Sequence, residues 1–371
     1  MNIKTAFSVE SDIREAVADI RQQLGGFEAK MLVFFASSIF DPERAARLMG
    51  NAFPDAVTFG CSTAGEIVSG RMLNHSVVAM AFSRDSLNGV KVEVLENITT
   101  GNPVDKAFDA FEQHFQTPPA AMDRKKYLGI LLIDGLSGAE ERVIDRIGDL
   151  TNINFVGGSA GDDLKFSATH VYANGKSYTN AAVLAVLEPA GPFSFIKTQS
   201  FSPLPQKLLV TKVNEAKREI LEFNHKPAAI AYAEAVGTSV ADAPNRFMSN
   251  PVGIVFEGDP YVLSPQRIMG NSMHFCCGVK EGMELNLLES TDIIADTKKA
   301  LEAARSELAG ISGIITFNCI LRTMELEQKG QSDKYGELFA GIPTIGFSTY
   351  GEQFIGHLNQ TAVMIAFHWT V

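Results

Sequence analysis

Three short stretches of the chain repeat one pattern of glycine, hydroxyl and acidic residues, and these residue types suit the binding of a small polar molecule. Turn 1 reads Phe-Gly-Cys-Ser-Thr-Ala-Gly-Glu at residues 59–66, and turn 3 reads Ile-Gly-Phe-Ser-Thr-Tyr-Gly-Glu at residues 345–352. Turn 2 is a looser copy, Phe-Val-Gly-Gly-Ser-Ala-Gly-Asp-Asp, at residues 155–163. Glycine-rich turns expose backbone N–H groups and let another molecule approach closely. We therefore expect the three turns to converge around a solvent-reachable hollow.

The side chains of the turns suit a zwitterionic ligand such as an amino acid. Paired hydroxyls in turns 1 and 3 can donate to a ligand carboxylate, and the glutamate that closes each turn can accept from an ammonium group. Arg322 can clamp a carboxylate with both ends of its guanidinium group, and two aromatic residues of turn 3 can wall the pocket. The predicted ligand-binding residues are Cys61, Ser62, Thr63, Glu66, Gly158, Ser159, Asp162, Arg322, Phe347, Ser348, Thr349, Tyr350 and Glu352.

A structural role is the alternative for each of these residues. Glycine can supply an unusual φ angle, hydroxyls can cap a helix or bind nearby backbone, and the turns of a duplicated fold can hold the repeats together. Arg322 can instead pair with Glu325 or Glu352 as a buried ion pair. Phe347 and Tyr350 can simply pack in a core.

Catalytic and metal-binding roles receive less support from the sequence. Cys61 or Ser62 could be the nucleophile of a hydrolase or transferase only if a histidine base lies within hydrogen-bond reach. A buried, inert thiol is the simpler interpretation of Cys61. Asp162 and Asp163 have no His or Glu at ligand spacing, and the four cysteines have no CxxC spacing, so we predict no metal site and no catalytic residue.

Composition limits the partners and the compartment. The chain has 371 residues and a formal net charge of −11. It lacks the clustered Lys and Arg that phosphate binding needs, so nucleic acid is not an expected partner. Its apolar runs are shorter than the roughly 20 residues that a membrane helix needs. The N-terminus lacks the apolar segment of a signal peptide. We therefore expect a cytoplasmic protein that does not bind a membrane.

The pattern of apolar runs predicts a repeated unit of strand, helix, strand, turn and strand. Such units favour an α/β (α+β mixed) fold in which helices cover mixed sheets. The proline-rich residues 189–205 are typical of a linker, so we predict two domains, residues 1–190 and 191–371. The predicted strand–helix–strand segments are residues 32–36, 42–53 and 57–60, then 130–133, 139–150 and 154–156, and finally 314–317, 322–329 and 344–347.

The three turns and several other segments resemble the FIST family over nearly the whole chain. The other segments are Val210-Thr211-Lys212, Lys226-Pro227-Ala228-Ala229 and Asn318-Cys319-Ile320-Leu321-Arg322. The resemblance implies a FIST N-terminal domain followed by a FIST C-terminal domain, in a non-enzymatic sensor of bacterial signal transduction. It implies an amino acid-like ligand, no required cofactor, and a signalling partner such as a histidine kinase or a cyclic-di-GMP enzyme.

One branch of the family offers a second hypothesis. Residues 319–322 and 346–353 look most like the NosP-like branch, which implies haem binding and nitric oxide sensing in a two-component system. His75 and His357, which lie within the repeated segments, are the candidate haem ligands. Where this branch carries Thr-Gln-His-Phe, the chain has Ser200 in place of the histidine, and a hydroxyl is a poor iron ligand.

Overall fold

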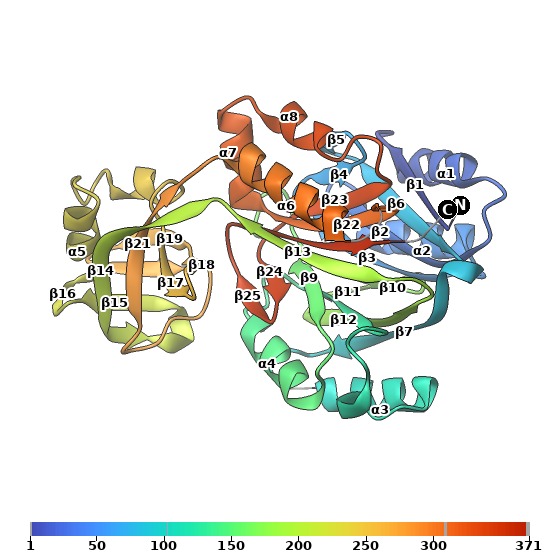
Figure 1. Ribbon diagram of the computed structural model, residues 1–371, viewed down its shortest axis with the longest axis horizontal. Coiled ribbons are helices and arrows are strands. Elements are labelled where there is room, and N and C mark those ends of the chain that lie inside the picture. Colours follow the sequence, from blue (N-terminus) through green and yellow to red (C-terminus); the bar gives the residue numbers. More distant parts are fainter. Residues whose placement is uncertain (1, 102, 308–309, 369–371) are drawn as a thin grey trace. The chain divides into compact units, whose positions relative to one another are not determined.

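The chain folds into two compact units, which we describe separately. The computed structural model describes residues 2–101, 103–307 and 310–368 (Figure 1). Unit 1 comprises Met1–Lys197, Lys298–His357 and Ala362–Val371, and unit 2 comprises Thr198–Thr297 and Leu358–Thr361. All of the residues predicted to bind a ligand belong to unit 1.

Unit 1 is built from three copies of one element order: an outer strand, a helix, two parallel strands joined by a helix, a hairpin and a closing strand. Repeat 1 contains β1 (Ile3–Ser8), α1 (Ile13–Leu24), β2 (Ala29–Ser37), α2 (Pro42–Ala52), β3 (Val57–Thr63), β4 (Glu66–Val68), β5 (Arg71–Leu73) and β6 (Val77–Ser83). Repeat 2 contains β7 (Leu87–Glu96), α3 (Val104–Phe115), β8 (Leu128–Ile133), α4 (Glu140–Leu150), β9 (Phe155–Ser159), β10 (Val171–Ala173), β11 (Lys176–Tyr178) and β12 (Ala181–Pro189).

Repeat 3 has the same order, but unit 2 is inserted into it between the outer strand and its helix. Its elements are β13 (Phe193–Gln199), α6 (Ile293–Glu307), β22 (Gly313–Cys319), α7 (Ile320–Gln328), α8 (Ser332–Glu337), β23 (Thr344–Thr349), β24 (Glu352–Phe354), β25 (Gly356–Leu358) and β26 (Thr361–Phe367). The compact units therefore differ from the expected division at residues 190/191. The reason is that β13 and β22 both pair with β26 in one sheet, which returns Lys298–His357 and Ala362–Val371 to unit 1.

Each sheet of unit 1 takes its last hairpin from another repeat. The strand orders are β1-β6-β2-β3-β10-β11, β7-β12-β8-β9-β24-β25 and β13-β26-β22-β23-β4-β5. The hairpin of repeat 1 thus completes the sheet of repeat 3, the hairpin of repeat 3 completes that of repeat 2, and the hairpin of repeat 2 completes that of repeat 1. We call this arrangement the hairpin exchange.

Local sequence accounts for the elements of each repeat. Strands β2 and β3 run parallel, as do β8 and β9 and also β22 and β23, and a helix connects each pair as a parallel connection requires. Asp12 and Asp41 cap α1 and α2 by accepting hydrogen bonds from first-turn N–H groups, and Pro42 occupies the first turn of α2. The apolar faces of both helices pack on the first sheet, where Ile20 and Met49 are fully buried. The predicted mixed α/β class is confirmed.

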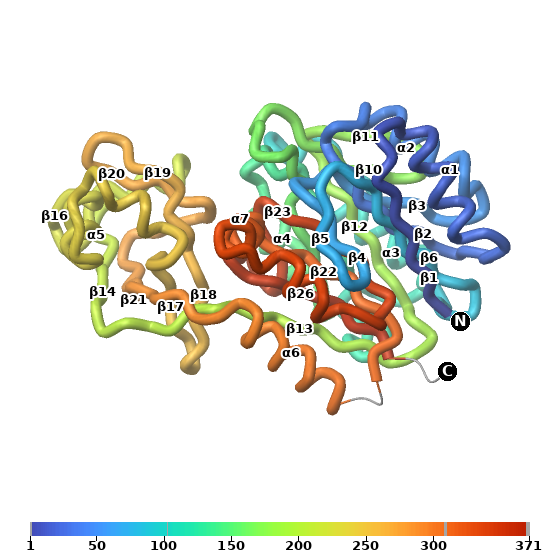
Figure 2. The backbone as a smooth tube through the Cα atoms, turned by 90° about the horizontal axis from the view of Figure 1, so that it is seen from above, coloured from blue at the N-terminus to red at the C-terminus, as the bar shows by residue number. Residues whose placement is uncertain are grey.

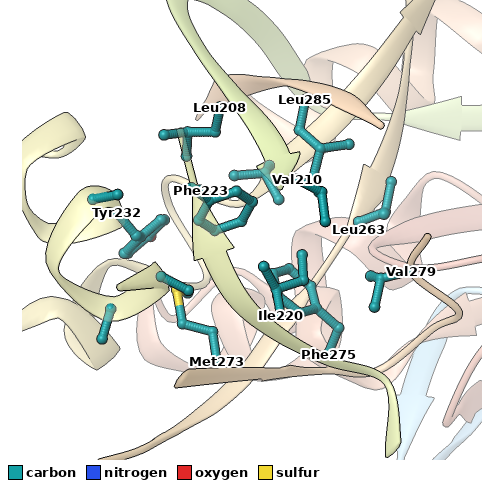
Figure 3. Close-up of a cluster of buried hydrophobic side chains, with 14 of the residues drawn as sticks. Leu208, Val210, Ile220, Phe223, Tyr232, Leu263, Met273, Phe275, Val279 and Leu285 are labelled. Carbon is teal, nitrogen blue, oxygen red and sulfur yellow. The ribbon is translucent and has the colours of Figure 1, made fainter. Parts of the chain in front are cut away.

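Unit 2 is an antiparallel sheet with one main helix. Its elements are β14 (Phe201–Asn214), β15 (Glu219–Phe223), β16 (Lys226–Pro227), α5 (Ala228–Ala235), β17 (Val252–Phe256), β18 (Asp259–Leu263), β19 (Pro265–Met269), β20 (Ser272–Phe275) and β21 (Glu284–Ser290). Figure 3 shows its core, in which Phe223 lies among Leu208, Tyr232 and Met273. Unit 2 therefore has a hydrophobic core of its own.

Candidate functional site

The three turns meet one another through backbone hydrogen bonds. Turn 1 spans the end of β3 and the start of β4, turn 2 follows β9, and turn 3 joins β23 to β24. The N–H to O distances are 2.8 Å for Ser348 to Gly65, 3.3 Å for Ala64 to Ser348, 2.8 Å for Ser159 to Gly351, 3.1 Å for Tyr350 to Ser159, and 3.0 Å for Gly161 to Ser62. The hairpin exchange causes this meeting, because each turn leads into a hairpin that belongs to a neighbouring sheet. The turns therefore meet as expected, but they pack against one another, and no residue of turn 3 lines the cavity that borders turns 1 and 2.

Glycine is needed in the turns because the neighbouring repeat passes very close. A Cβ atom on Gly161 would lie 2.9 Å from the backbone nitrogen of Ala64, and one on Gly158 would lie 2.6 Å from Cγ2 of Thr349. Atoms in real structures do not approach a Cβ this closely. The small residues of turns 1, 2 and 3 thus allow contact between repeats, which is the structural alternative raised by the sequence.

The threonines of turns 1 and 3 bind the glutamates of their own turns. Thr63 Oγ1 donates to the Glu66 carboxylate, which also accepts from the N–H group (3.0 Å) and the hydroxyl group (2.6 Å) of Ser76. Thr349 Oγ1 donates to Glu352 Oε1 at 2.6 Å. All five side chains are buried. Their hydrogen bonds are therefore made inside the protein.

Burial raises the pKa values of two side chains in turn 1, Glu66 and Cys61. Removal of the Glu66 carboxyl group from water raises its pKa from 4.5 to about 7, although hydrogen bonds from Ser76 and Thr63 oppose the shift. Burial, with a smaller contribution from Glu66, also holds the pKa of the Cys61 thiol well above its ordinary value. The thiol of Cys61 is consequently protonated and unreactive near neutral pH.

Other predicted residues are also parts of the interior. Ser159 Oγ donates to Glu140 at 3.3 Å, and the Ser348 and Thr323 hydroxyl groups are 2.8 Å apart. The rings of Phe35, Phe317 and Phe347 pack against one another, with centroids of Phe35 and Phe347 separated by 4.6 Å.

Arg322 is a buried cation rather than one exposed at a strand end. Its side chain is 2% exposed, and Nε donates to Asn318 Oδ1 at 3.0 Å. Its guanidinium carbon lies 5.9 Å from the centre of the Tyr335 ring, within the range of a cation–π contact.

A cavity of about 160 Å³ borders turns 1 and 2. It lies at the carboxyl ends of the parallel strands β2 and β3, which is where ligands bind in many open α/β sheets. Of the residues predicted from the sequence, Ser62 and Asp162 line it. The full lining is Ser38, Phe40, Pro42, Ser62, Asp162, Lys165, Ser167, Ala168, His170 and Tyr172.

The loop of residues 162–168 on one side of the cavity is strained. Asp163, Leu164 and Phe166 have φ angles of 55°, 60° and 49°, a left-handed conformation that side-chain-bearing residues rarely adopt. Such a conformation costs on the order of 1–3 kcal/mol per residue and tends to cluster at ligand-binding loops. The Asp162 carboxylate holds the loop by accepting from the N–H groups of Phe166, Ser167 and Ala168 at 3.0, 2.7 and 3.1 Å.

Tyr350 of turn 3, in repeat 3, binds this loop of repeat 2 through its hydroxyl group and its ring. Its hydroxyl group donates to Asp162 Oδ1 at 2.5 Å and accepts from the Leu164 N–H group at 2.7 Å. Burial opposes ionisation of Asp162, but hydrogen bonds from Tyr350 and from the loop backbone outweigh it and lower the pKa of the carboxyl group. The Tyr350 ring also stacks on Phe166, with centroids 5.2 Å apart. Tyr350 therefore acts on the cavity through the loop.

Charge is distributed unevenly around the cavity. Lys165 Nζ lies 3.2 Å from Ser38 Oγ and 3.6 Å from Asp163 Oδ2. On the side of His170, burial lowers the pKa of the imidazole, while the negative charges of Asp134, Glu43 and Asp41 act to raise it. His170 Nδ1 is 3.1 Å from Ser177 Oγ. The cavity thus has a cation at one side and a negative electrostatic field at the other.

The sequence interpretation missed Lys165, His170 and Ser38. The signal for Ser38 was its place directly after a buried strand that runs parallel to the next strand. Lys165 lies two residues after turn 2, and His170 directly precedes the strand that pairs with β3, but neither position forms a motif by itself.

The two candidate haem ligands differ in exposure, and His357 does not offer iron an open position. His75 is exposed on a turn with a φ angle of 56°. His357 Nδ1 is 3.0 Å from Gln353 Nε2, and among the described residues its buried Nε2 has no partner. The His357 imidazole packs so closely on Gly351 that a Cβ there would lie 2.2 Å from Cε1. An iron atom at Nε2 would need this packing to open, so we derive no step through haem.

Evidence for nucleophilic or metal chemistry is equally weak. Ser62 Oγ donates to Gly161 O at 2.8 Å and accepts from the backbone N–H group of His170 at 3.0 Å, so both contacts are to the main chain. Within the described part of the chain, no group of three or more His, Cys, Asp or Glu side chains could hold a metal ion.

Comparison with known protein families identifies the family of the chain. The FIST N domain matches residues 30–226, and the FIST C domain matches residues 228–355. The chain belongs to the FIST family, whose domains are generally small-ligand sensors of signal transduction rather than catalysts. A search of curated proteins found no match. In the part that the structure describes, no helix has the length and apolar character needed to cross a membrane.

Proposed function

We propose that the chain is a sensor whose unit 1 binds an amino acid-like zwitterion in the 160 Å³ cavity and passes the bound state to a separate signalling protein, such as a histidine kinase or a cyclic-di-GMP enzyme. The observation that carries this proposal is the position of the cavity. It lies at the carboxyl ends of β2 and β3 and is bordered by the strained loop of residues 162–168.

The lining of the cavity matches the two charges of the ligand. The Lys165 ammonium group suits a carboxylate, and the hydroxyl groups of Ser38 and Ser167, which donate to Asp163 and Asp162, would exchange these partners for the ligand. The negative field near His170 suits an ammonium group, and the lowered pKa of the imidazole keeps His170 neutral at pH 7. A volume of 160 Å³ is below the roughly 300–1,000 Å³ of drug-sized sites, which favours a ligand of few heavy atoms.

The loop of residues 162–168, which the ligand contacts, can pass the bound state on to a partner protein. Lys165 belongs to the strained loop, and Leu164 and Phe166 of the same loop expose 40% and 58% of their surface. A ligand that draws Lys165 inward favours one conformation of the loop over another, and this changes the apolar surface that a partner meets. Tyr350 links the same conformational change to turn 3.

Isothermal titration with a panel of amino acids tests the proposal. We expect heat from at least one of them, and we expect Lys165→Met to weaken that binding about tenfold or more because a charged contact is lost. Lys106→Met is the matched control, since Lys106 is exposed on α3. Absence of heat from every amino acid contradicts the proposed ligand class. A Soret band after addition of haemin identifies the haem hypothesis instead.

A further inference from the structure

A groove of about 590 Å³ runs between α1 and α2 on the outer face of unit 1. Figures 1 and 2 both show the two helices side by side. The apolar part of its lining is Val17 and Ala18 from α1 with Leu48 and Ala52 from α2, and the polar part is Arg14, Arg21, Gln22 and Asn51. The groove therefore combines an apolar floor with a basic edge and contains no carboxylate.

The charges of α1 are separated around the helix. Arg14 and Arg21 are seven residues apart, so they lie two turns apart on the same stripe as Val17 and Ala18. Glu15 and Asp19 belong to another stripe, together with the capping Asp12. The arginines consequently face the groove, whereas the acidic residues of α1 do not line it.

The side chains of Arg14 and Arg21 bind no other described residue through an ion pair or a hydrogen bond. Among the described residues they stay unpaired, although the chain carries a net charge of −11. Arg14 lies in the first turn of α1, where the helix macrodipole disfavours a cation. The structure of α1 thus gives no electrostatic reason for a basic residue at that position.

The groove continues past the ends of the helices. A second hollow of about 530 Å³ shares Arg21 and Ala52 with it and adds the aromatic side chains of Phe27 and Phe53. It carries charges of both signs, from Arg84, Glu28 and Asp55. The apolar surface therefore extends over more than the length of one helix.

We propose that this groove docks an acidic amphipathic helix of a partner protein. An apolar stripe at helical spacing fills a groove between two helices in a common mode of peptide recognition. The two arginines, about 10 Å apart along α1, select a partner helix with two carboxylates about seven residues apart and apolar residues between them. Nucleic acid is a poor alternative, because two arginines on a chain of net charge −11 give little attraction to phosphates.

Selection from a display library of random helix-favouring peptides, with the full chain as the immobilised target, tests the proposal. We expect the selected peptides to carry Asp or Glu at positions about seven residues apart, flanking apolar residues at the third and fourth positions between them. Fluorescence anisotropy then measures the affinity of a selected peptide for variants of the chain. We expect Arg14→Glu combined with Arg21→Glu to weaken binding at least about tenfold, because like charges then face each other.

Two further variants keep the test specific. Arg47→Glu alters an exposed arginine of α2 outside the groove lining, so we expect less than about a twofold effect. Ala18→Trp fills the groove without changing its charge and should also abolish binding; circular dichroism checks that each variant is folded. Selection of neutral or basic peptides, or equal weakening by Arg47→Glu, overturns the proposal. A dimer of the chain that the double variant dissociates also overturns it, because the occupant is then a second copy.

Discussion

Glu66 is a buried carboxyl group that accepts hydrogen bonds from Thr63 and Ser76. Burial nevertheless dominates, since the pKa rises from 4.5 to about 7. A carboxyl group with a raised pKa binds more protons in the folded than in the unfolded protein over this pH range. The free energy of unfolding must then fall as the pH rises from about 4.5 to about 7 and stay level above it.

Glu66→Gln removes this titration. When the pH is raised from 5 to 8, the unchanged protein should lose up to about 3 kcal/mol of unfolding free energy that the variant does not lose, because each pKa unit corresponds to about 1.4 kcal/mol. Urea unfolding of both proteins at the two pH values measures the difference. Glu112→Gln, on the exposed face of α3, is the control and should follow the unchanged protein. Parallel pH profiles for Glu66→Gln and the unchanged protein contradict the prediction.

Individual residues show how far the sequence could be interpreted. Ser62 and Asp162, chosen from the turn pattern, do border a cavity, whereas Thr63 and Thr349 hydrogen-bond to the glutamates three positions later. The pattern of residue types is the same in both situations. All four side chains are buried, and only the first two border the cavity. That difference depends on strands that lie hundreds of residues away, so the ligand-binding roles stay predictions.

Among the elements, the turns are where the repeats touch most closely. The order of strand, helix and strand was predictable because apolar periodicity and capping residues such as Asp41 are local signals. The hairpin exchange was not predictable, because a three-residue strand such as β4 carries no local sign of its partner β23. For the same reason, the sequence did not predict that the third repeat joins the first two in one compact unit.

Gly161→Ala tests the close contact between turns. The new Cβ would lie 2.9 Å from the backbone nitrogen of Ala64, which cannot move independently, so we expect a loss of about 1–3 kcal/mol in the free energy of unfolding. Gly148→Ala is the matched control on α4, where nothing lies within 4 Å of the added atom. We expect that change to stabilise the protein by up to about 1 kcal/mol. Equal stability of the two variants in urea would contradict the predicted close contact between the turns.

At the scale of the whole molecule, unit 1 depends on its last segment. Residues 1–190 contain every strand of the first sheet, but the second sheet lacks β24 and β25, and the β4–β5 hairpin lacks its partner β23. We therefore expect a fragment of residues 1–190, the first domain predicted from the sequence, to lack cooperative thermal unfolding and to bind a hydrophobic dye. The full chain should show neither property. A fragment that unfolds as sharply as the full chain contradicts the hairpin exchange.

The hairpin exchange also has a consequence for synthesis of the protein. While a ribosome is still translating the chain, β4 and β9 are finished long before β23 and β24 exist, so their edges stay without neighbours until nearly 350 residues have been made. Unpaired strand edges on nascent polypeptides invite aggregation. Closure of the final contacts between distant segments is intrinsically slow, and a cell that makes this protein must protect the growing chain through most of its translation.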